Sequence, residues 1–343
     1  MPTLTAAYLQ SVTSRIFQAA GVPGETAERV SASLVESNLV GHDSHGVIRI
    51  MSYLRDLRQN LVDPQAQVEV LQETPTTALL DGHWGFGQVV AARAMAVAIA
   101  KAREERTGVV AARRSYHIGR LGEYALMAAG QGLIGLVMCN SAIAAIAPFG
   151  GCGRALGSNP LAWAVPAGGR PPFLLDFSTG MCAEGKLRVA RSKGQRVPEG
   201  WILDRDGRPT TSPQDFYDGG AILPAAGHKG YALGLLIEIL GGVLTGHGCA
   251  LLAEHGRGNG FVMWALDVAA FCPLERFQAT LDALCEGLKA GRKAPGVDEI
   301  LIPGEPEFRT REFRLREGIP VPASTWQEIV QEAGALGVEV ESR

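Results

Sequence analysis

The chain begins and ends with helical patterns, and this arrangement limits the folds that it can adopt. Apolar residues recur at helical spacing over 4–20 and 25–40, and Gly21 follows the first segment as a left-handed C-terminal residue. The tail, 306–343, is polar and again helical in pattern. Because the strand patterns lie between these segments, we expect the two ends of the chain to pack together as one helical domain.

The middle of the chain alternates short apolar segments, typical of buried strands, with longer helical ones. The expected strands are 77–82, 109–112, 135–139, 173–176 and 261–266, and the expected helices are 88–106, 121–130, 229–245 and 274–290. The segment 229–245 is apolar almost throughout, so we expect it at the centre of the core. The patterns predict an α/β (mixed α+β) fold, with a helical domain at 1–72 with 300–343 and a central mixed-sheet region at 73–299.

Bulk composition narrows the functional class. Hydrophobic residues make up 46% of the 343 residues and charged residues 20%, which is ordinary for a globular protein. The net charge of −3 argues against a nucleic-acid or membrane-surface partner. The six cysteines are scattered without a C-x-x-C pair, and the N-terminus lacks the pattern of a secretory signal. We therefore expect reduced thiols and a cytoplasmic location.

The segment 43–53 carries a combination of side chains suited to acid chemistry. Asp43 or Ser44 is the kind of residue that caps a helix, and His45 and Arg49, four residues apart, would then share one helix face. Tyr53 follows one turn later. An imidazole beside a guanidinium can move a proton while the guanidinium holds a carboxylate, which suits a 2-oxo acid. A surface His and Arg at a helix start is the alternative.

A dinucleotide-binding fingerprint, G-x-G-x-x-G between a strand and a helix, is absent. Gly85 and Gly87 are followed by Val90 at the third glycine position, and Gly151 and Gly153 by Leu156. A chain of this kind that binds a nicotinamide cofactor must therefore do so without the doubly wound fold.

His42 and His45 have the H-x-x-H spacing of some metal ligands. A catalytic zinc site needs a third protein ligand, and the other histidines are isolated in the sequence. We expect no metal, and a metal-dependent hydrolase built on these two residues remains a distant alternative.

Three further positions combine polar side chains with apolar surroundings. His117 lies where a strand gives way to a loop, and Asp176 ends an apolar strand, where burial would require hydrogen bonds or a His to orient. Lys229, after His228, opens the long apolar helix, where it could hold a phosphate together with the free N–H groups. A structural His, a turn aspartate and an exposed Lys are the alternatives. Glu238 in the same helix requires a partner that the sequence does not name.

Several sequence blocks together resemble the malate/L-lactate dehydrogenase-like family, over nearly the whole chain. The blocks that carry the resemblance are Gly41-His42-Asp43-Ser44-His45-Gly46, His117-Ile118-Gly119, Ala147-Pro148-Phe149-Gly150, Gly157-Ser158-Asn159-Pro160-Leu161-Ala162, Leu175-Asp176, Gly227-His228-Lys229-Gly230-Tyr231-Ala232-Leu233 and Ile302-Pro303-Gly304-Glu305. The likeness is strongest to the hydroxycarboxylate dehydrogenases. It implies a non-Rossmann NAD(P)-binding fold and a homodimer with the active site near the interface.

By resemblance, His45 would be the proton donor and acceptor, with Ser44 and Arg49 beside it, while His117 and Asp176 would line the same site. The expected cofactor contacts are Ser141, Asp176, Phe177, Ser178, His228, Lys229, Gly304 and Glu305. Departures are mild: the family often has Thr at Ser158 and Asp-Met-Ala at 176–178. Arg49 is not universal among the closest relatives.

The function expected from these residues is hydride transfer between NAD(P)H and the carbonyl of a 2-oxo acid. A cyclic-imine (piperideine- or pyrroline-2-carboxylate) reductase or a ureidoglycolate-type dehydrogenase of the same family is the alternative, and a non-catalytic ligand-binding protein is a more distant one. The sequence leaves open which acid is used, whether the cofactor is NAD or NADP, and whether His45 or His117 dominates the proton transfer.

Overall fold

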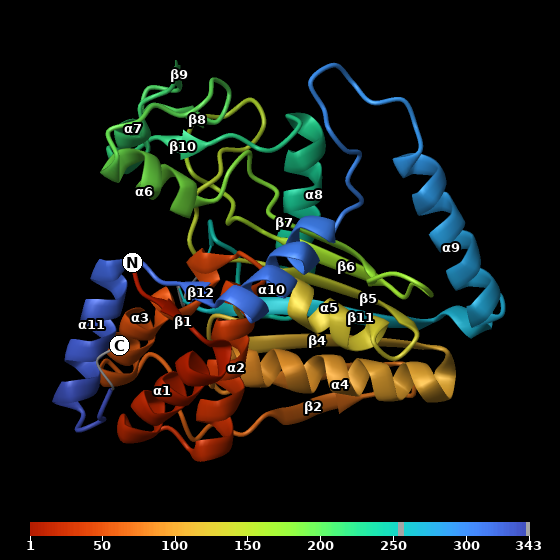
Figure 1. The fold of residues 1–343 in the computed structure, drawn as a ribbon, viewed down its shortest axis with the longest axis horizontal. Helices are drawn as coiled ribbons and strands as arrows, with labels where there is room; N and C mark the ends of the chain where they lie inside the picture. Colours follow the sequence, from red (N-terminus) through yellow and green to blue (C-terminus); the bar gives the residue numbers. More distant parts are fainter. Residues whose placement is uncertain (253–256, 341–343) are drawn as a thin grey trace.

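A computed structural model describes residues 1–252 and 257–340 of the protein. Its centre is a seven-stranded sheet in the order β2-β3-β4-β11-β5-β6-β7 (Figure 1). Only β3 and β4 pair in parallel among these neighbours; the other pairs are antiparallel. The strands are β2 (Glu69–Glu73), β3 (Thr77–Asp81), β4 (Thr107–Ser115), β5 (Leu133–Cys139), β6 (Leu161–Val165), β7 (Phe173–Phe177) and β11 (Asn259–Asp267). The expected mixed sheet is confirmed.

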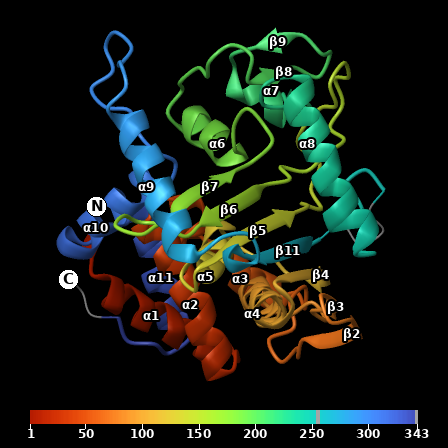
Figure 2. The same ribbon diagram turned by 90° about the vertical axis from the view of Figure 1, so that its right-hand side faces the viewer.

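Two helices cover one face of this sheet at close range. They are α4 (Gly87–Glu105) and α5 (Gly122–Ala129), seen on the same side of the strands in Figure 2. The buried side of α4 is rich in alanine, and Gly108 of β4 lies where a Cβ would clash with the backbone of α4 at Ala98. Gly135 of β5 meets α5 in the same way at Ala125. Small residues on both partners thus allow the helices to pack tightly on the strands.

The two ends of the chain pack against each other, as their helical patterns indicated. The N-terminal helices α1 (Ala6–Ala19), α2 (Gly24–Leu39) and α3 (Ile50–Arg58) share one hydrophobic cluster with α11 (Ala323–Ala335). The short strands β1 (Thr3–Leu4) and β12 (Ile319–Pro320) pair antiparallel, and α10 (Glu305–Glu317) forms ion pairs with the N-terminal region. The domain boundaries at 72/73 and 299/300 stay a prediction.

A smaller unit lies above the edge of the main sheet in Figure 1. It consists of a three-stranded antiparallel sheet in the order β10-β8-β9 and two short helices. These elements are α6 (Glu184–Ser192), β8 (Ile202–Leu203), β9 (Pro209–Thr210), α7 (Pro213–Tyr217) and β10 (Ala221–Ile222). Ile146, Leu187, Ile202 and Phe216 are in its separate hydrophobic cluster.

The apolar segment 229–245 is not fully buried, so the expectation that it forms the centre of the core is wrong. It forms α8 (His228–Glu238), which continues as the π-helical turn η3 (Ile239–Leu244) on the other side of the sheet from α5 (Figure 2). Its buried glycines, Gly241 and Gly242, pack against the ends of the strands. Because the glycine side faces the sheet, Val243 and Leu244 point outward and are 63% and 62% exposed.

The last long helix of the middle region, α9 (Leu274–Lys289), follows the short turn η4 (Val268–Ala270) and lies at the right of Figure 1. Within residues 1–252 and 257–340, the helices are all too short or too polar to cross a membrane. The cytoplasmic location stays a prediction.

Replacing Gly87 by Ala should destabilise the protein. A Cβ at this position would clash with the carbonyl oxygens of both Tyr116 and His117, so the first turn of α4 could no longer pack on the loop that carries His117. We expect a loss of about 1–3 kcal/mol in the free energy of unfolding, measured by denaturant titration. Gly287→Ala in α9 is the matched control, because its Cβ would meet open space; a similar loss there would contradict this account.

Candidate active site

The segment 43–53 folds as two tight turns followed by a helix. The 3-10 turns η1 (Asp43–His45) and η2 (Val47–Arg49) precede α3, so the single capped helix expected from the sequence is wrong. The cause lies in a tertiary contact: Asn38 of α2 accepts a hydrogen bond from the Val47 backbone N–H at 2.8 Å. Gly46 makes room for this amide, since a Cβ there would overlap the Asn38 side chain.

Asp43 does not cap a helix. Its carboxylate accepts hydrogen bonds from the Asn38 amide at 2.6 Å and from the Arg314 guanidinium of α10 at 2.7 Å. These bonds tie the turn to both ends of the chain. The turn is therefore held by the side chain of Asn38 on the preceding helix and by Arg314 from the far end of the chain, rather than by a helix cap.

His45 and His117 meet face to face. Their rings stack with centroids 5.7 Å apart and an interplanar angle of 17°. The Ser44 hydroxyl lies 3.1 Å from His45 Nδ1, and Arg49 Nε donates to the Ser44 carbonyl oxygen at 2.7 Å. The structure therefore brings together four of the residues selected from the sequence, although three come from the N-terminal turns and one from the loop after β4.

A chain of hydrogen bonds supports His117 from behind. The Tyr53 hydroxyl is 2.7 Å from His117 Nδ1 and accepts a hydrogen bond from Gln88 Nε2 at 2.8 Å. Tyr53 and Gln88 are both fully or almost fully buried. Because Tyr53 contacts Nδ1, Nε2 is the ring nitrogen of His117 left for a ligand. The sequence reasoning missed Gln88; its signal was a polar residue on the buried, alanine-rich side of α4.

Both histidines are held in their neutral form. Burial lowers the pKa of His45 to about 3, with the positive charges of Arg49, His42 and Arg120 adding to the effect. Burial, followed by the charge of Arg49, places the pKa of His117 well below its usual value. At neutral pH both stacked rings are therefore uncharged, each with one nitrogen able to accept a hydrogen bond, and the charge beside them comes from the arginines.

Asp176, at the end of β7, has the hydrogen bond that its burial required. Its Oδ2 accepts from the Gly122 backbone N–H, the first of α5, at 2.7 Å, and lies 3.9 Å from Arg120 Nη1. Burial raises the pKa of Asp176, against the lowering effect of the Arg120 charge. The carboxylate thus joins β7 to the loop between His117 and α5. Arg120, 3% exposed, was missed by the sequence reasoning; its signal was a charged residue inside an apolar loop.

A groove of about 390 Å³ opens beside Asp176. It is lined by residues of β7 and of the turn before α10: Leu174, Leu175, Asp176, Phe177, Leu301, Ile302, Pro303, Gly304, Pro306 and Glu307. Three expected cofactor residues, Asp176, Phe177 and Gly304, are therefore side by side. Gly304 has φ +96°, and a Cβ there would lie 2.9 Å from Leu174 Cβ, so a larger residue would disturb this wall.

The other expected cofactor residues have different surroundings. The Glu305 carboxylate accepts hydrogen bonds from Lys289 Nζ at 2.7 Å, from Arg170 Nη2 at 2.9 Å and from the Ile302 backbone N–H at 3.1 Å. His228 and Lys229 are exposed at the start of α8, where the His228 ring packs against Phe149.

The last two expected cofactor residues, Ser141 and Ser178, lie shortly after β5 and β7. Ser141 donates its backbone N–H to Asn159 Oδ1 at 3.1 Å, and Ser178 follows directly after β7. Glu238 finds the partner that the sequence could not name, because Asn159 Nδ2 donates to it at 2.6 Å.

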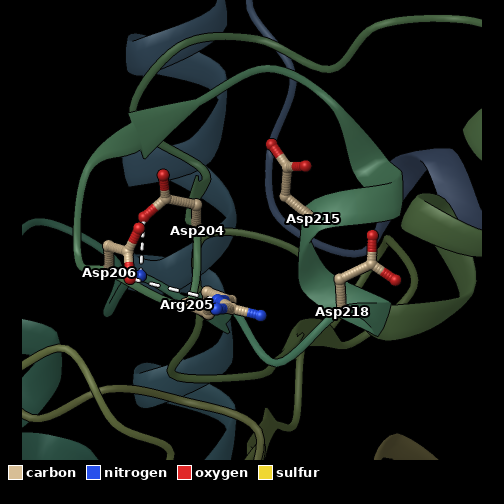
Figure 3. Close-up of a pocket in the computed structure, with 5 residues that line it drawn as sticks. All are labelled: Asp204, Arg205, Asp206, Asp215 and Asp218. Carbon is tan, nitrogen blue, oxygen red and sulfur yellow. Dashed lines mark hydrogen bonds and ion pairs between the residues drawn. The ribbon is translucent and has the colours of Figure 1, made fainter.

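A second hollow, of about 550 Å³, lies on the three-stranded sheet (Figure 3). It is lined by Asp204, Arg205, Asp206, Asp215 and Asp218. Its carboxylates serve local structure, since Asp204 accepts two backbone N–H groups of its own turn. Thr210 donates to Asp215 at 2.5 Å.

Across residues 1–252 and 257–340, no three His, Cys, Asp or Glu side chains are arranged to hold a metal ion. His42, one half of the H-x-x-H pair, faces Glu307 at 3.5 Å. His45 stacks on His117 instead.

Comparison with known proteins identifies the family. The model of the malate/L-lactate dehydrogenase family matches residues 4–330. The chain belongs to this family. It is 40% identical to a malate dehydrogenase of Pyrococcus horikoshii over 95% of this chain and 93% of that one, and 36% identical to hydroxycarboxylate dehydrogenase B of Escherichia coli over 97% and 94%.

Solved structures of malate/L-lactate dehydrogenase relatives share the fold. A malate dehydrogenase from Pyrococcus horikoshii matches with a TM-score of 0.91 and 37% identity, over 98% of this chain and 96% of that one. A Δ1-piperideine-2-carboxylate reductase from Pseudomonas syringae matches with a TM-score of 0.86 and 28% identity, over 97% and 100%. The expected family, fold and enzyme class, an NAD(P)-dependent hydroxy-acid dehydrogenase, are confirmed.

Acid should destabilise the protein through the two stacked histidines. The pKa of His45 is about 3 in the folded chain and near 6.5 when unfolded, so between these values the unfolded chain binds more protons. The free energy of unfolding should therefore fall as the pH drops from 6.5, by up to about 1.4 kcal/mol per pH unit for each such His. Denaturant titrations at several pH values measure this slope.

His45→Asn removes one of these groups, and its free energy of unfolding should fall less steeply below pH 6.5. His228→Asn, at an exposed position, is the control and should follow the wild type. Parallel curves for His45→Asn and the wild type would contradict the buried, neutral state of His45.

Proposed function

We propose that His45 transfers the proton when this dehydrogenase interconverts a 2-hydroxy acid and its 2-oxo acid. The observation that carries the proposal is the stacked His45–His117 pair with Arg49 beside it. A nicotinamide cofactor supplies or accepts the hydride when bound. In the oxidative direction, neutral His45 accepts the hydroxyl proton, and Arg49 holds the carboxylate next to the reacting carbon.

In the reductive direction, His45 must first gain a proton. Burial and the charges of Arg49, His42 and Arg120 keep it neutral in the free protein. A bound carboxylate offsets the positive charge of the arginines, which raises the pKa of His45 and favours its protonated form. Substrate binding and proton uptake are therefore coupled in this site.

His117 and Asp176 have supporting parts in this proposal. The Tyr53 hydroxyl occupies His117 Nδ1, so His117 presents Nε2 to the substrate oxygen as a second hydrogen-bonding group. Asp176 fixes the start of α5 and with it the loop that carries His117. Ser44 orients the His45 ring through its 3.1 Å contact with Nδ1.

The residues around the groove fit a nicotinamide cofactor. Apolar walls from Leu174, Phe177 and Ile302 can take a flat ring, and the Gly304 turn leaves the space that a side chain would fill. Ser178 and Ser141 would bind polar groups of the cofactor, and Lys229 with His228 at the start of α8 would bind a phosphate. Glu305 would hold the groove wall through Lys289 and Arg170. Both NAD and NADP remain candidates.

A cyclic-imine reductase is the second candidate. It is favoured by the likeness to the piperideine-2-carboxylate reductase structure. The same residues would serve it, with the C=N bond of a cyclic imine in place of C=O and His45 as the proton donor to nitrogen.

The purified protein should oxidise NADH or NADPH with at least one 2-oxo acid, followed by nicotinamide absorbance. The panel includes pyruvate, oxaloacetate and a carboxylate-bearing cyclic imine, which separates the two candidates. His45→Ala should lower kcat by roughly 10²–10⁴-fold, because a positioned acid–base group is lost. Near-normal turnover in this variant, with a large loss in His117→Ala, would move the proton transfer to His117. Silence across the panel with both cofactors would refute the proposed function.

We also propose that a second copy of this chain covers the exposed side of α8 and η3, so that the enzyme is a homodimer. Exposed apolar side chains follow one another along this surface: Leu235, Leu236, Ile239, Val243 and Leu244. Contiguous apolar surface of this kind is unfavourable in water and is typical of a protein interface. Because α8 begins with His228 and Lys229, the interface would adjoin the proposed phosphate contact.

Light scattering should give twice the chain mass for the wild type. The double substitution Val243→Asp with Leu244→Asp places two charges in the proposed interface and should yield monomers. Val189→Asp on α6 is the matched control, since Val189 is 52% exposed on another surface. A monomeric wild type, or a double variant that remains dimeric, would refute the proposed interface.

A further inference from the structure

Gln88 is a buried amide beside the hydroxyl of Tyr53. It is the second residue of α4, and its exposed fraction is 0%. Its Nε2 donates to the Tyr53 hydroxyl oxygen at 2.8 Å, whereas its Oε1 is enclosed without a hydrogen-bond partner among residues 1–252 and 257–340. Burial of a half-satisfied amide is unfavourable, so a glutamine at this position requires an explanation beyond packing.

The hydrogen bonds of the Tyr53 hydroxyl have a definite direction. In the part of the chain that the structure describes, its partners are Gln88 Nε2, which can only donate, and His117 Nδ1 at 2.7 Å. Burial raises the pKa of Tyr53 to about 12, so the hydroxyl keeps its hydrogen at neutral pH. Tyr53 therefore accepts a hydrogen bond from Gln88 and donates its own hydrogen to His117.

This direction determines which nitrogen of His117 carries a hydrogen. A neutral imidazole has one N–H group and one bare nitrogen. Burial, followed by the charge of Arg49, keeps His117 neutral, and Nδ1 is the bare nitrogen because it accepts from Tyr53. Nε2 therefore carries the hydrogen, so the nitrogen left for a ligand is a hydrogen-bond donor and not a base.

Close packing holds Gln88 against the loop that carries His117. Gly87 allows this approach, because a Cβ there would lie 2.3 Å from the carbonyl oxygens of Tyr116 and His117. A Cβ at Gly119 would lie 3.5 Å from Gln88 Nε2, so the amide nitrogen adjoins the same loop. Gln88 thus supports the site from behind and acts on a ligand only through other residues.

We propose that Gln88 is a positioning residue that, through Tyr53, holds His117 as an N–H donor to the reacting oxygen and leaves the proton transfer to His45. This inference rests on the proposed function. In the reductive direction, the carbonyl carbon gains a hydride, the oxygen accepts a hydrogen bond from His117 Nε2, and His45 supplies the proton that completes the hydroxyl group. His117 keeps its hydrogen in both directions. An N–H group aimed at the oxygen stabilises the negative charge that develops there.

The position of this hydrogen can be measured in the free protein, without substrate. With ¹⁵N-labelled histidine, long-range ¹H–¹⁵N correlation spectra separate protonated from bare ring nitrogens, and the signal lost in His117→Gln gives the assignment. The wild type should carry the hydrogen on Nε2. Gln88→Glu has a similar shape but offers an acceptor to the Tyr53 hydroxyl, so the His117 hydrogen should move to Nδ1. Arg29, whose Nε donates to the Gln88 carbonyl at 3.4 Å, favours an ionised carboxylate at this position.

The kinetics should follow the same change. Gln88→Glu should lower kcat for a 2-oxo acid by roughly 10²–10³-fold, the effect of losing one donor to the reacting oxygen, with KM values within about threefold of the wild type. Gln88→Met should lower kcat by about 10-fold when Tyr53 is present and by less than about twofold in a Tyr53→Phe background, because Gln88 acts through that hydroxyl. Gln278→Met is the matched control: this α9 amide donates to the Ala167 carbonyl at 3.0 Å, and its loss should leave kcat unchanged.

Several outcomes would overturn the proposal. A hydrogen on Nδ1 in the wild type would make His117 a base, and an unchanged hydrogen position in Gln88→Glu would show that Gln88 does not determine it. Equal losses from Gln88→Met with and without the Tyr53 hydroxyl would leave Gln88 a purely structural part. If Gln88→Glu does not fold, the spectrum of Gln88→Met replaces it and should contain both forms of His117. If the wild type turns over no 2-oxo acid, the proposed function fails, while the spectra still decide which nitrogen carries the hydrogen.

Discussion

The site depends on one strand that enters the sheet late in the chain. β11 pairs with β4 on one side and β5 on the other, and its first residue, Asn259, bonds to the segments that follow both strands. Asn259 Oδ1 accepts from the Ile118 N–H at 3.1 Å, and its Nδ2 donates to the Asn140 carbonyl at 2.7 Å. Asn140 in turn accepts from the Gly260 N–H at 2.8 Å. The position of the His117 loop is therefore set by the centre of the sheet.

An aromatic cluster joins this loop to the helices formed by the chain ends. The Tyr53 ring of α3 lies edge-on to that of Tyr116, with the ring centroids 5.3 Å apart. Its centroid is 6.0 Å from that of Phe86, and the Phe86 ring packs on Phe17 of α1 with centroids 5.9 Å apart. Tyr116 immediately precedes His117. The stacked histidines thus adjoin an apolar contact between the helices and the sheet, because the Tyr53 ring also contacts His117. This contact helps groups from distant segments to keep a fixed geometry.

Much of this arrangement follows from patterns that the sequence displays. The helical and strand periodicities predicted most of the helices and strands, and the motif blocks predicted His45, His117 and the family, because these signals are local. The turns at 43–49 differ from the expected helix because the Asn38 side chain, which binds Val47, is a tertiary partner. The exposure of Val243 was not predictable either, since apolarity does not reveal whether side chains or glycines face the sheet. Gln88 and Arg120 were missed because their importance arises from groups that are distant in sequence.

The charges around the two histidines indicate how the site gains specificity. Neutral imidazoles add no charge that could attract or repel a ligand, so the arginines and Asp176 dominate the local field. Asp176 is held by a backbone N–H at the start of α5, and the same carboxylate oxygen lies 3.9 Å from Arg120 Nη1. Asp176 and Glu307 partly balance the charge of Arg120, and a bound anion would balance that of Arg49. Selectivity for an acidic ligand and activation of His45 then have the same cause, because the anion that balances Arg49 also favours the protonated imidazole.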